Sequence, residues 1–203
     1  MGEKVVAQSS FMMPNPVTIT GRISSVTNAF VNGVIPCIFP TNDEVERVLA
    51  LLEMDADDVR CAYCGGEYTE WDHFRPLVVA KKPTGYISEI NNLVPACGKC
   101  NQSKGNRYWR DWIVSDAKKS PKTRGVANLA DLIARLENFE KQSKPIKMDF
   151  ESVVGKSKWE EHWNNCNKLH AMMKESQVLS DEIKRVLEEN INLLREQDDG
   201  ETL

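Results

Sequence analysis

Two cysteine pairs, Cys61-Ala-Tyr-Cys64 and Cys97-Gly-Lys-Cys100, enclose the stretch of sequence that decides the fold of this chain. Together they can supply four thiolates to one tetrahedral zinc ion, which leaves no coordination position for water and is therefore a structural site. The spacing favours this use of the cysteines over catalytic thiols. The pairs lie further apart than in a compact zinc ribbon, so we expect zinc to tie together the ends of an insert made of strands and a loop.

Asp72 and His73 lie inside this insert, and Asn101 follows the second cysteine pair directly. The Asp72 carboxylate and the Asn101 amide oxygen are hard ligands of the kind that Mg²⁺ or Mn²⁺ prefers. A neutral imidazole such as that of His73 can accept a proton from water near neutral pH. Simpler roles compete with these: a core histidine bonded to its neighbour for His73, and a helix N-cap for Asn101.

The order of these residues resembles that of the HNH endonucleases of the ββα-metal type. The resemblance rests on Asp72-His73, on Asn92-Leu93 shortly before the second cysteine pair, and on the run Asn101-Gln-Ser-Lys-Gly105. It extends from Cys61 to Gly105, so most of the 203 residues lie outside it. The last histidine of the family pattern is replaced by Asn101 here, which is a known variation.

The resemblance implies a role for each matching residue. Asp72 and Asn101 would hold one catalytic divalent ion, Mg²⁺ or Mn²⁺, on the scissile phosphate, and His73 would be the general base that activates the attacking water. Asn92, rather than its neighbour Asn91, would orient the strand and imidazole of His73. Basic residues near the motif are candidates for contacts with nucleic-acid phosphate, although a solvated surface explains them equally well. These candidates are Arg75, Lys104 and Arg107.

Local patterns around the cysteine pairs predict the order strand, strand, helix. Residues 67–77 are predicted as a strand, residues 90–94 as a second extended segment, and residues 101–112 as a helix that a glycine weakens. Residues 81–89 between the strands are predicted as a loop. Trp109 and Trp112 share one face of the helix, and we expect them to pack in the core rather than stack on bases.

The flanks carry separate signals. Thr41-Asn-Asp-Glu44 fits a capping box and predicts a helix that runs to about residue 54. Residues 1–40 are rich in Pro, Gly, Ser and Thr, and we expect strands or extended arms with little helix there. Helical periodicity predicts a helix over residues 127–139, and two further helices or one long helix over residues 156–194.

Charge is distributed unevenly along the chain, whose net charge is −4. Residues 60–124 contain 12 Lys and Arg against 6 Asp and Glu, a net charge of +6, whereas the segments on either side are each at −5. Positive charge is therefore concentrated on the segment that carries the motif, as a phosphate-binding surface requires. A solvated basic surface with no ligand is the alternative.

Composition restricts the class of protein. The hydrophobic fraction of 41% and the charged fraction of 28% are those of an ordinary globular protein. No stretch is long and apolar enough to span a bilayer, and residues 1–15 lack the pattern of a signal peptide, so a cytoplasmic location is expected. In that reducing compartment, CxxC pairs favour metal binding over disulfides.

The predicted fold is α+β: a zinc-clipped ββα core at residues 60–114, a mixed N-terminal arm and helix at 1–59, and an α-helical extension at 115–203. The expected function is metal-dependent endonuclease cleavage of DNA, in the setting of restriction or anti-phage defence. The flanks are expected to form a homodimer or to select the target. Two alternatives remain. One is a non-catalytic zinc-dependent module that binds nucleic acid, and the other is an adaptor that acts through its C-terminal helices.

Overall fold

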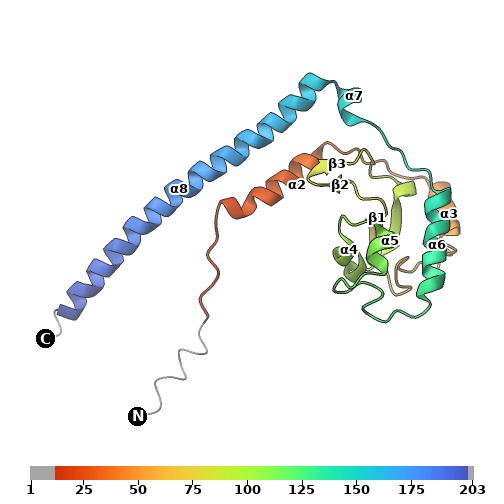
Figure 1. Cartoon of the computed structure of the whole chain (residues 1–203), viewed down its shortest axis with the longest axis horizontal. Coiled ribbons are helices and arrows are strands. Elements are labelled where there is room, and N and C mark those ends of the chain that lie inside the picture. The colour runs from red at the N-terminus through yellow and green to blue at the C-terminus, as the bar shows by residue number, and fades with distance from the viewer. Residues whose placement is uncertain (1–11, 201–203) are drawn as a thin grey trace, which may run out of the picture. The chain divides into compact units, whose positions relative to one another are not determined.

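The computed structural model describes residues 12–200, which belong to two compact units that we treat separately (Figure 1). One unit comprises residues 28–161, and the other joins residues up to Thr27 to those from His162 onward. The short elements before the core are the 3-10 helix η1 (Thr20–Arg22), α2 (Ile23–Gly33) and α3 (Asn42–Leu51). Among the described residues, no helix is long and apolar enough to cross a membrane.

Two antiparallel strands and a helix form the centre of the larger unit. Strand β1 (Glu70–His73) pairs with β4 (Leu93–Ala96) in a register that places Asp72 opposite Val94, and α4 (Gly98–Lys104) follows β4 directly. The predicted α+β fold with a ββα core is therefore confirmed. Strand β1 is shorter than the predicted strand over 67–77, because the chain turns at Arg75, whose backbone bonds a side chain instead of a strand.

The residues between β1 and β4 contain more regular structure than the predicted loop. Strands β2 (Val78–Val79) and β3 (Lys82–Pro83) pair in a hairpin. The segment predicted as extended over residues 90–94 begins instead as the 3-10 helix η2 (Ile90–Asn92), and β4 starts at Leu93. The two residues between β2 and β3 both have positive φ, 49° at Ala80 and 63° at Lys81, as a tight hairpin turn requires. Neither residue is a glycine, which is why the sequence did not indicate this turn.

The helix predicted over residues 101–112 is divided in two. Helix α4 starts earlier, at Gly98 after the N-cap Cys97, and ends at Gly105, whose φ of 53° departs from helical geometry. Helix α5 (Trp109–Ile113) then resumes. Asn101 is not an N-cap, because its N–H already donates to the carbonyl of Cys97 at 3.0 Å. Its side chain is thus left for another role.

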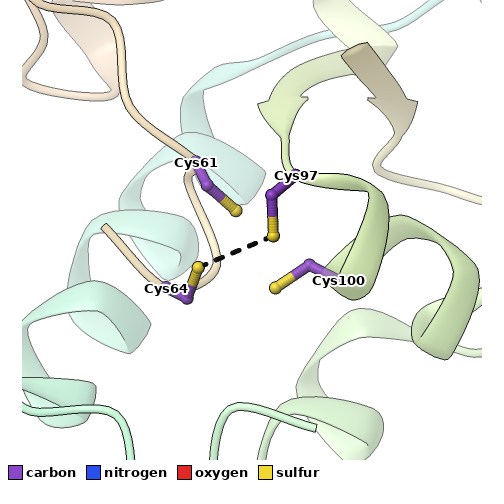
Figure 2. A group of neighbouring side chains, drawn as sticks. All are labelled: Cys61, Cys64, Cys97 and Cys100. Atoms are coloured by element: carbon purple, nitrogen blue, oxygen red, sulfur yellow. Dashed lines mark hydrogen bonds between the residues drawn. The ribbon is translucent and has the colours of Figure 1, made fainter. Parts of the chain in front are cut away.

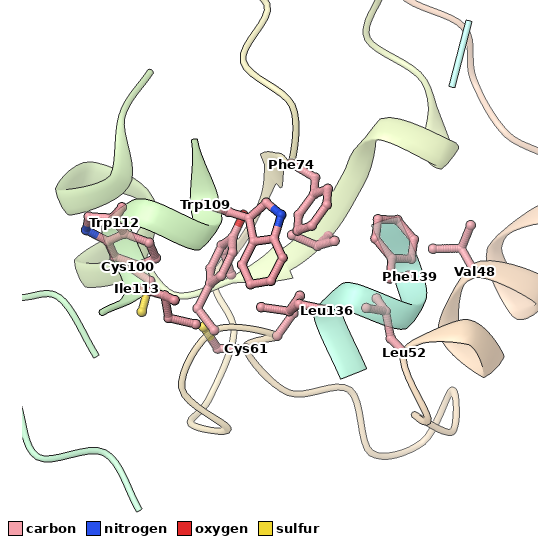
Figure 3. Close-up of a cluster of buried hydrophobic side chains, with 14 of the residues drawn as sticks. Val48, Leu52, Cys61, Phe74, Cys100, Trp109, Trp112, Ile113, Leu136 and Phe139 are labelled. Atoms are coloured by element: carbon pink, nitrogen blue, oxygen red, sulfur yellow. The ribbon is translucent and has the colours of Figure 1, made fainter. Parts of the chain in front are cut away.

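Aromatic side chains fill the core beside the ββα elements (Figure 3). Trp109 and Trp112 are almost fully buried, so their predicted place in the core is confirmed. Trp109 stacks on Phe74 at 5.3 Å between ring centroids. The same core includes residues of α3 and of α6 (Leu129–Gln142), such as Leu136. The segment boundaries at 59/60 and 114/115 stay a prediction, and helices from both flanks pack on this core.

The helical flanks agree with the sequence in part. Both halves of the capping box at Thr41 and Glu44 are present, so the predicted start of α3 is confirmed. The expectation of little helix before residue 40 was wrong, because α2 covers Ile23–Gly33 and buries Val31 fully. Ile23, Val26 and Phe30 repeat at helical spacing, a period that the Pro- and Gly-rich context concealed.

The C-terminal region consists of α7 (Phe150–Val154) and α8 (Lys156–Gly200), in addition to α6. Helix α8 is a single unbroken helix of 45 residues (Figure 1). Of the two alternatives predicted for residues 156–194, one long helix is therefore confirmed. In the smaller unit, the N-terminal segment bonds to α8 through the Ile19 N–H, which donates to the Gln177 side chain at 2.7 Å. Thr27 likewise contacts His170 of α8, at 3.2 Å.

Candidate metal and active site

The four cysteines of the two pairs meet at one point. Cys61 and Cys64 lie on the loop before β1, and Cys97 and Cys100 lie at the start of α4, with their sulfur atoms turned toward a common centre (Figure 2). All four Sγ atoms lie within 4.8 Å of one another. A tetrahedral zinc ion about 2.3 Å from each sulfur would separate the sulfurs by about 3.8 Å. The Cys64–Cys97 distance is 3.8 Å, so this cluster fits zinc.

A cation supports this thiolate cluster from outside. The Arg124 Nη2 donates to Cys100 Sγ at 2.9 Å. Four thiolates around Zn²⁺ carry two excess negative charges, and a guanidinium beside them offsets part of that charge. The sequence indicated only that residues 60–124 carry a net positive charge. Arg124 is a contributor to the cluster that spacing arguments missed, because it lies well outside the two cysteine pairs.

The predicted catalytic residues share one pocket. Asp72 and His73 from the end of β1, and Asn101 from α4, line a cavity of about 250 Å³. Strand neighbours ordinarily face opposite sides, but His73 is the last residue of β1, where the regular alternation ends. Further residues that the sequence did not indicate also line the pocket. These are Asn28 and Asn32 of α2, Pro76, Leu77 and Val78 around β2, and Gly105 and Asn106 after α4.

The Asp72 carboxylate is 5% exposed and bound by two donors. The Tyr63 hydroxyl donates to its Oδ2 at 2.6 Å, and the Lys104 ammonium forms an ion pair with the same oxygen at 2.9 Å. Burial lowers the pKa of Lys104, while the neighbouring Asp72 opposes that shift. Burial also raises the pKa of Tyr63 well above its usual value, and the Asp72 charge adds to the rise, so Tyr63 is a neutral hydrogen-bond donor.

The His73 imidazole is half-buried, and its Nε2 lies 2.9 Å from the Ser88 hydroxyl. Burial lowers the pKa of His73; the Asp72 carboxylate opposes this shift and the Lys104 ammonium adds to it. The imidazole is therefore neutral at neutral pH, the form that can accept a proton. When Nε2–H donates to Ser88, Nδ1 carries the lone pair.

Asn92 is fully buried, and its side chain bonds the main chain just after β1 rather than His73 directly. Its Oδ1 accepts from the N–H of Arg75 at 2.9 Å, and its Nδ2 donates to the carbonyl of Arg75 at 3.0 Å. The main chain of Asn92 is bonded to the neighbouring residue, since the Phe74 N–H donates to the Asn92 carbonyl at 2.8 Å. These bonds fix the turn directly after His73, which suits the orienting role predicted for Asn92.

Replacing Asn92 with alanine is expected to lower the free energy of unfolding by about 2 kcal/mol, since it leaves the partly buried N–H and carbonyl of Arg75 without their side-chain partner. The matched control is Asn91→Ala, whose side chain instead contacts Arg47 and Glu89 near the surface. That change is expected to cost less than about 1 kcal/mol. Urea unfolding monitored by tryptophan fluorescence measures both, and equal losses would contradict a specific role for Asn92.

The three basic residues predicted to bind phosphate have different surroundings. Lys104 is 1% exposed and held by Asp72, and its Nζ also donates to the carbonyl of His73 at 2.8 Å. The Arg75 guanidinium donates to the Glu140 carbonyl and to Ser143, at 2.8 and 3.2 Å. Arg107 is exposed, although its guanidinium bonds the carbonyls of Ser103 and Lys104. Of the three, Arg107 is the most accessible to an external phosphate.

Comparison with known proteins agrees with this geometry. Residues 61–107 match the model of the HNH endonuclease family, which is the stretch that holds the cysteine cluster, β1, β4 and α4. Residues 61–107 therefore form a domain of the HNH type.

A segment of the chain is 40% identical over 57 residues to the CRISPR-associated endonuclease Cas9 of Corynebacterium diphtheriae. The aligned segment covers 26% of this chain but only 5% of that protein, so the likeness concerns a small part of the relative. No solved structure matches the chain.

Proposed function

We propose that this protein is a metal-dependent HNH endonuclease that hydrolyses phosphodiester bonds of DNA. The observation that carries the proposal is the convergence of Asp72, His73 and Asn101 on one pocket, at the end of a strand and on the helix that follows the cysteine cluster. A module that only binds nucleic acid has no need of a carboxylate, an imidazole and an amide at one cavity. The match of residues 61–107 to the HNH family supports the same conclusion.

His73 acts as the general base in this proposal. Its neutral imidazole takes a proton from water at the ring nitrogen that Ser88 does not bind, and the resulting hydroxide attacks the phosphorus. Asn92 fixes the turn that follows His73 and so limits the movement of the strand end. The leaving group is the 3′ oxygen of the scissile bond.

Asp72 and Asn101 are the residues that would hold the catalytic divalent ion, Mg²⁺ or Mn²⁺, and the cysteine cluster would hold Zn²⁺. Their oxygens are suitable donors, and the contacts of Tyr63 and Lys104 with Asp72 use Oδ2 and not Oδ1. The divalent ion supplies Lewis-acid stabilisation of the charge that develops on the leaving oxygen. The Lys104 ammonium balances the charge of the Asp72 carboxylate.

DNA is expected to approach across exposed basic residues of the +6 segment, because phosphate contacts supply most of the sequence-independent affinity. Lys104 and Arg75 are engaged inside the protein, so among the predicted phosphate contacts we propose Arg107 first. The other exposed cations of the segment are Arg60, Lys81, Lys82, Lys99, Lys118, Lys119 and Lys122. A role in restriction or anti-phage defence fits such an enzyme and belongs to the same proposal.

Incubation of the purified protein with supercoiled plasmid, phage DNA and single-stranded RNA tests the substrate class. Each reaction is run with Mg²⁺, with Mn²⁺ and with EDTA. We expect both DNAs to be nicked or cut with either metal, and EDTA to abolish cleavage. Tight binding of all three nucleic acids without cleavage would favour the non-catalytic binding module instead.

Cleavage of both strands calls for a dimer or for two separate binding events, and α8 carries a surface that suits pairing with a second copy. Leu179, Val186 and Leu193 occupy d positions of a heptad repeat, and Ile183 and Asn190 occupy the a positions between them. The apolar members of this a/d seam are 48–57% exposed. A single asparagine at an a position favours a two-stranded coiled coil in defined register. We therefore include a homodimer through α8 in the proposal.

A parallel pairing is expected, because an antiparallel one places g positions opposite g positions, so that Glu182 would face Glu189 of the second copy. Val186→Glu introduces a charge into the seam of both copies and should convert the dimer to a monomer of 23.0 kDa. Ile191→Glu is the matched control, because Ile191 is as exposed as Val186, at 48%, but lies at a b position. Sedimentation velocity measures the mass, and an unmodified protein that sediments at 23.0 kDa would contradict the dimer.

A further inference from the structure

Tyr63 is a neighbour of the cysteine cluster in sequence, and it also contacts Asp72, the proposed metal ligand. It lies between Cys61 and Cys64 in the first pair, and its side chain is fully buried. Its ring packs edge-on against Trp112, with 5.3 Å between ring centroids. Its hydroxyl reaches Asp72 Oδ2 at 2.6 Å, a short distance that is typical of a hydroxyl donating to a carboxylate.

The loop that carries Tyr63 is held rigidly on both sides. The Cys61 N–H donates to the Gly66 carbonyl at 2.7 Å, and the Ala62 N–H donates to the carbonyl of Pro95 in β4 at 2.8 Å. A metal ion in the cysteine cluster would fix both cysteines that flank Tyr63. The position of the Tyr63 hydroxyl therefore depends on a loop that main-chain bonds hold and that the occupied cysteine cluster would fix further.

Two donors from different elements converge on one oxygen of Asp72. Tyr63 approaches from the first cysteine pair, and Lys104 approaches from the end of α4 at 2.9 Å. With Oδ2 held by both, the carboxylate cannot rotate about its last torsion angle without losing two charge-assisted hydrogen bonds. Oδ1 is the oxygen that neither of these donors binds, and Asp72 lines the same pocket as Asn101.

We propose that Tyr63 is a positioning residue that transmits the geometry of the cysteine cluster to the catalytic metal ligand, by fixing Asp72 so that it offers one oxygen to the ion. The inference rests on the proposed function for the identity of the ligand. It assigns a second task to the zinc cluster: besides stabilising the fold, the cluster aligns the carboxylate through a single hydroxyl. Partners behind a metal ligand commonly change metal affinity by about 10- to 100-fold.

The test distinguishes the contribution of the Tyr63 hydroxyl from that of the Tyr63 ring. Tyr63→Phe keeps the packing against Trp112 and removes only the bond to Asp72. Tyr108→Phe is the matched control, because its hydroxyl also donates to a carboxylate, that of Glu140 at 2.9 Å, on a residue that does not line the pocket. Asp72→Asn reports how much of the measured affinity depends on the proposed ligand.

Mn²⁺ is titrated into the zinc-loaded, full-length proteins without DNA, and free Mn²⁺ is counted from its electron paramagnetic resonance signal. We expect Tyr63→Phe to raise the dissociation constant of Mn²⁺ roughly tenfold, at unchanged zinc content. Tyr108→Phe should bind Mn²⁺ as the unmodified protein does. The same affinity in Tyr63→Phe and the unmodified protein would overturn the inference, and so would Mn²⁺ binding that is insensitive to Asp72→Asn.

An assay of plasmid cleavage distinguishes failure of this inference from failure of the proposed nuclease function. Cleavage by the unmodified protein, together with Mn²⁺ affinity that does not change in Tyr63→Phe, removes the positioning role and leaves the nuclease intact. Mn²⁺ binding that depends on both Asp72 and Tyr63 supports the positioning role even where no tested DNA is cut.

Discussion

Replacing Cys61 with serine is expected to abolish zinc binding and cooperative unfolding of the larger unit. Zinc in a four-cysteine site contributes about 10–16 kcal/mol of apparent binding free energy, whereas a whole domain is stable by only about 5–15 kcal/mol. Cys61 belongs to the cysteine cluster and also to the hydrophobic core, where it is fully buried. Loss of its thiolate therefore opens the metal site and the core together.

Zinc content by elemental analysis and thermal melting by circular dichroism measure this effect. Cys37→Ser is the matched control, because Cys37 is exposed and lies outside the cluster, and it should leave both quantities unchanged. A strong chelator should reproduce the loss of the melting transition in the unmodified protein. A Cys61→Ser variant that retains one zinc per chain and melts as before would exclude a structural role for the cluster.

Replacing His73 with alanine is expected to reduce the rate of DNA cleavage by about 10²–10⁴-fold, the usual contribution of a general base. The fold should survive, because His73 is only half-buried and its side-chain contact is the hydroxyl of Ser88. Zinc content and melting temperature are measured beside the rate to verify this. His170→Ala is the control histidine, since it lies on α8 outside the pocket and should leave the rate unchanged.

The cysteine cluster and the ββα order could be predicted from sequence, because their signals are short and local. A CxxC pair fixes the spacing of its own ligands, and a capping box such as that at Thr41 is complete within four residues. The pocket residues Asp72, His73 and Asn101 were also found in this way. Each lies within or beside a motif that sequence alone displays.

The rest depends on contacts between residues far apart in the chain. Lys104 was taken for a surface cation, and only the fold shows that its ammonium is buried against Asp72, 32 positions earlier. Tyr63 and Arg124 were missed for the same reason: nothing in the sequence around a hydroxyl or a guanidinium indicates which distant residue it bonds. The α2 helix was missed because proline and glycine nearby outweighed a short helical repeat.

Single-turnover cleavage of supercoiled plasmid by the unmodified protein and by His73→Ala, in Mg²⁺ and in Mn²⁺, tests the central claim most directly. With zinc content equal in both proteins, the account predicts conversion of plasmid to nicked and linear forms by the unmodified protein. It predicts a rate slower by about two orders of magnitude or more in the variant. Equal rates in the two proteins would contradict the assignment of His73 and of the pocket as the site of cleavage.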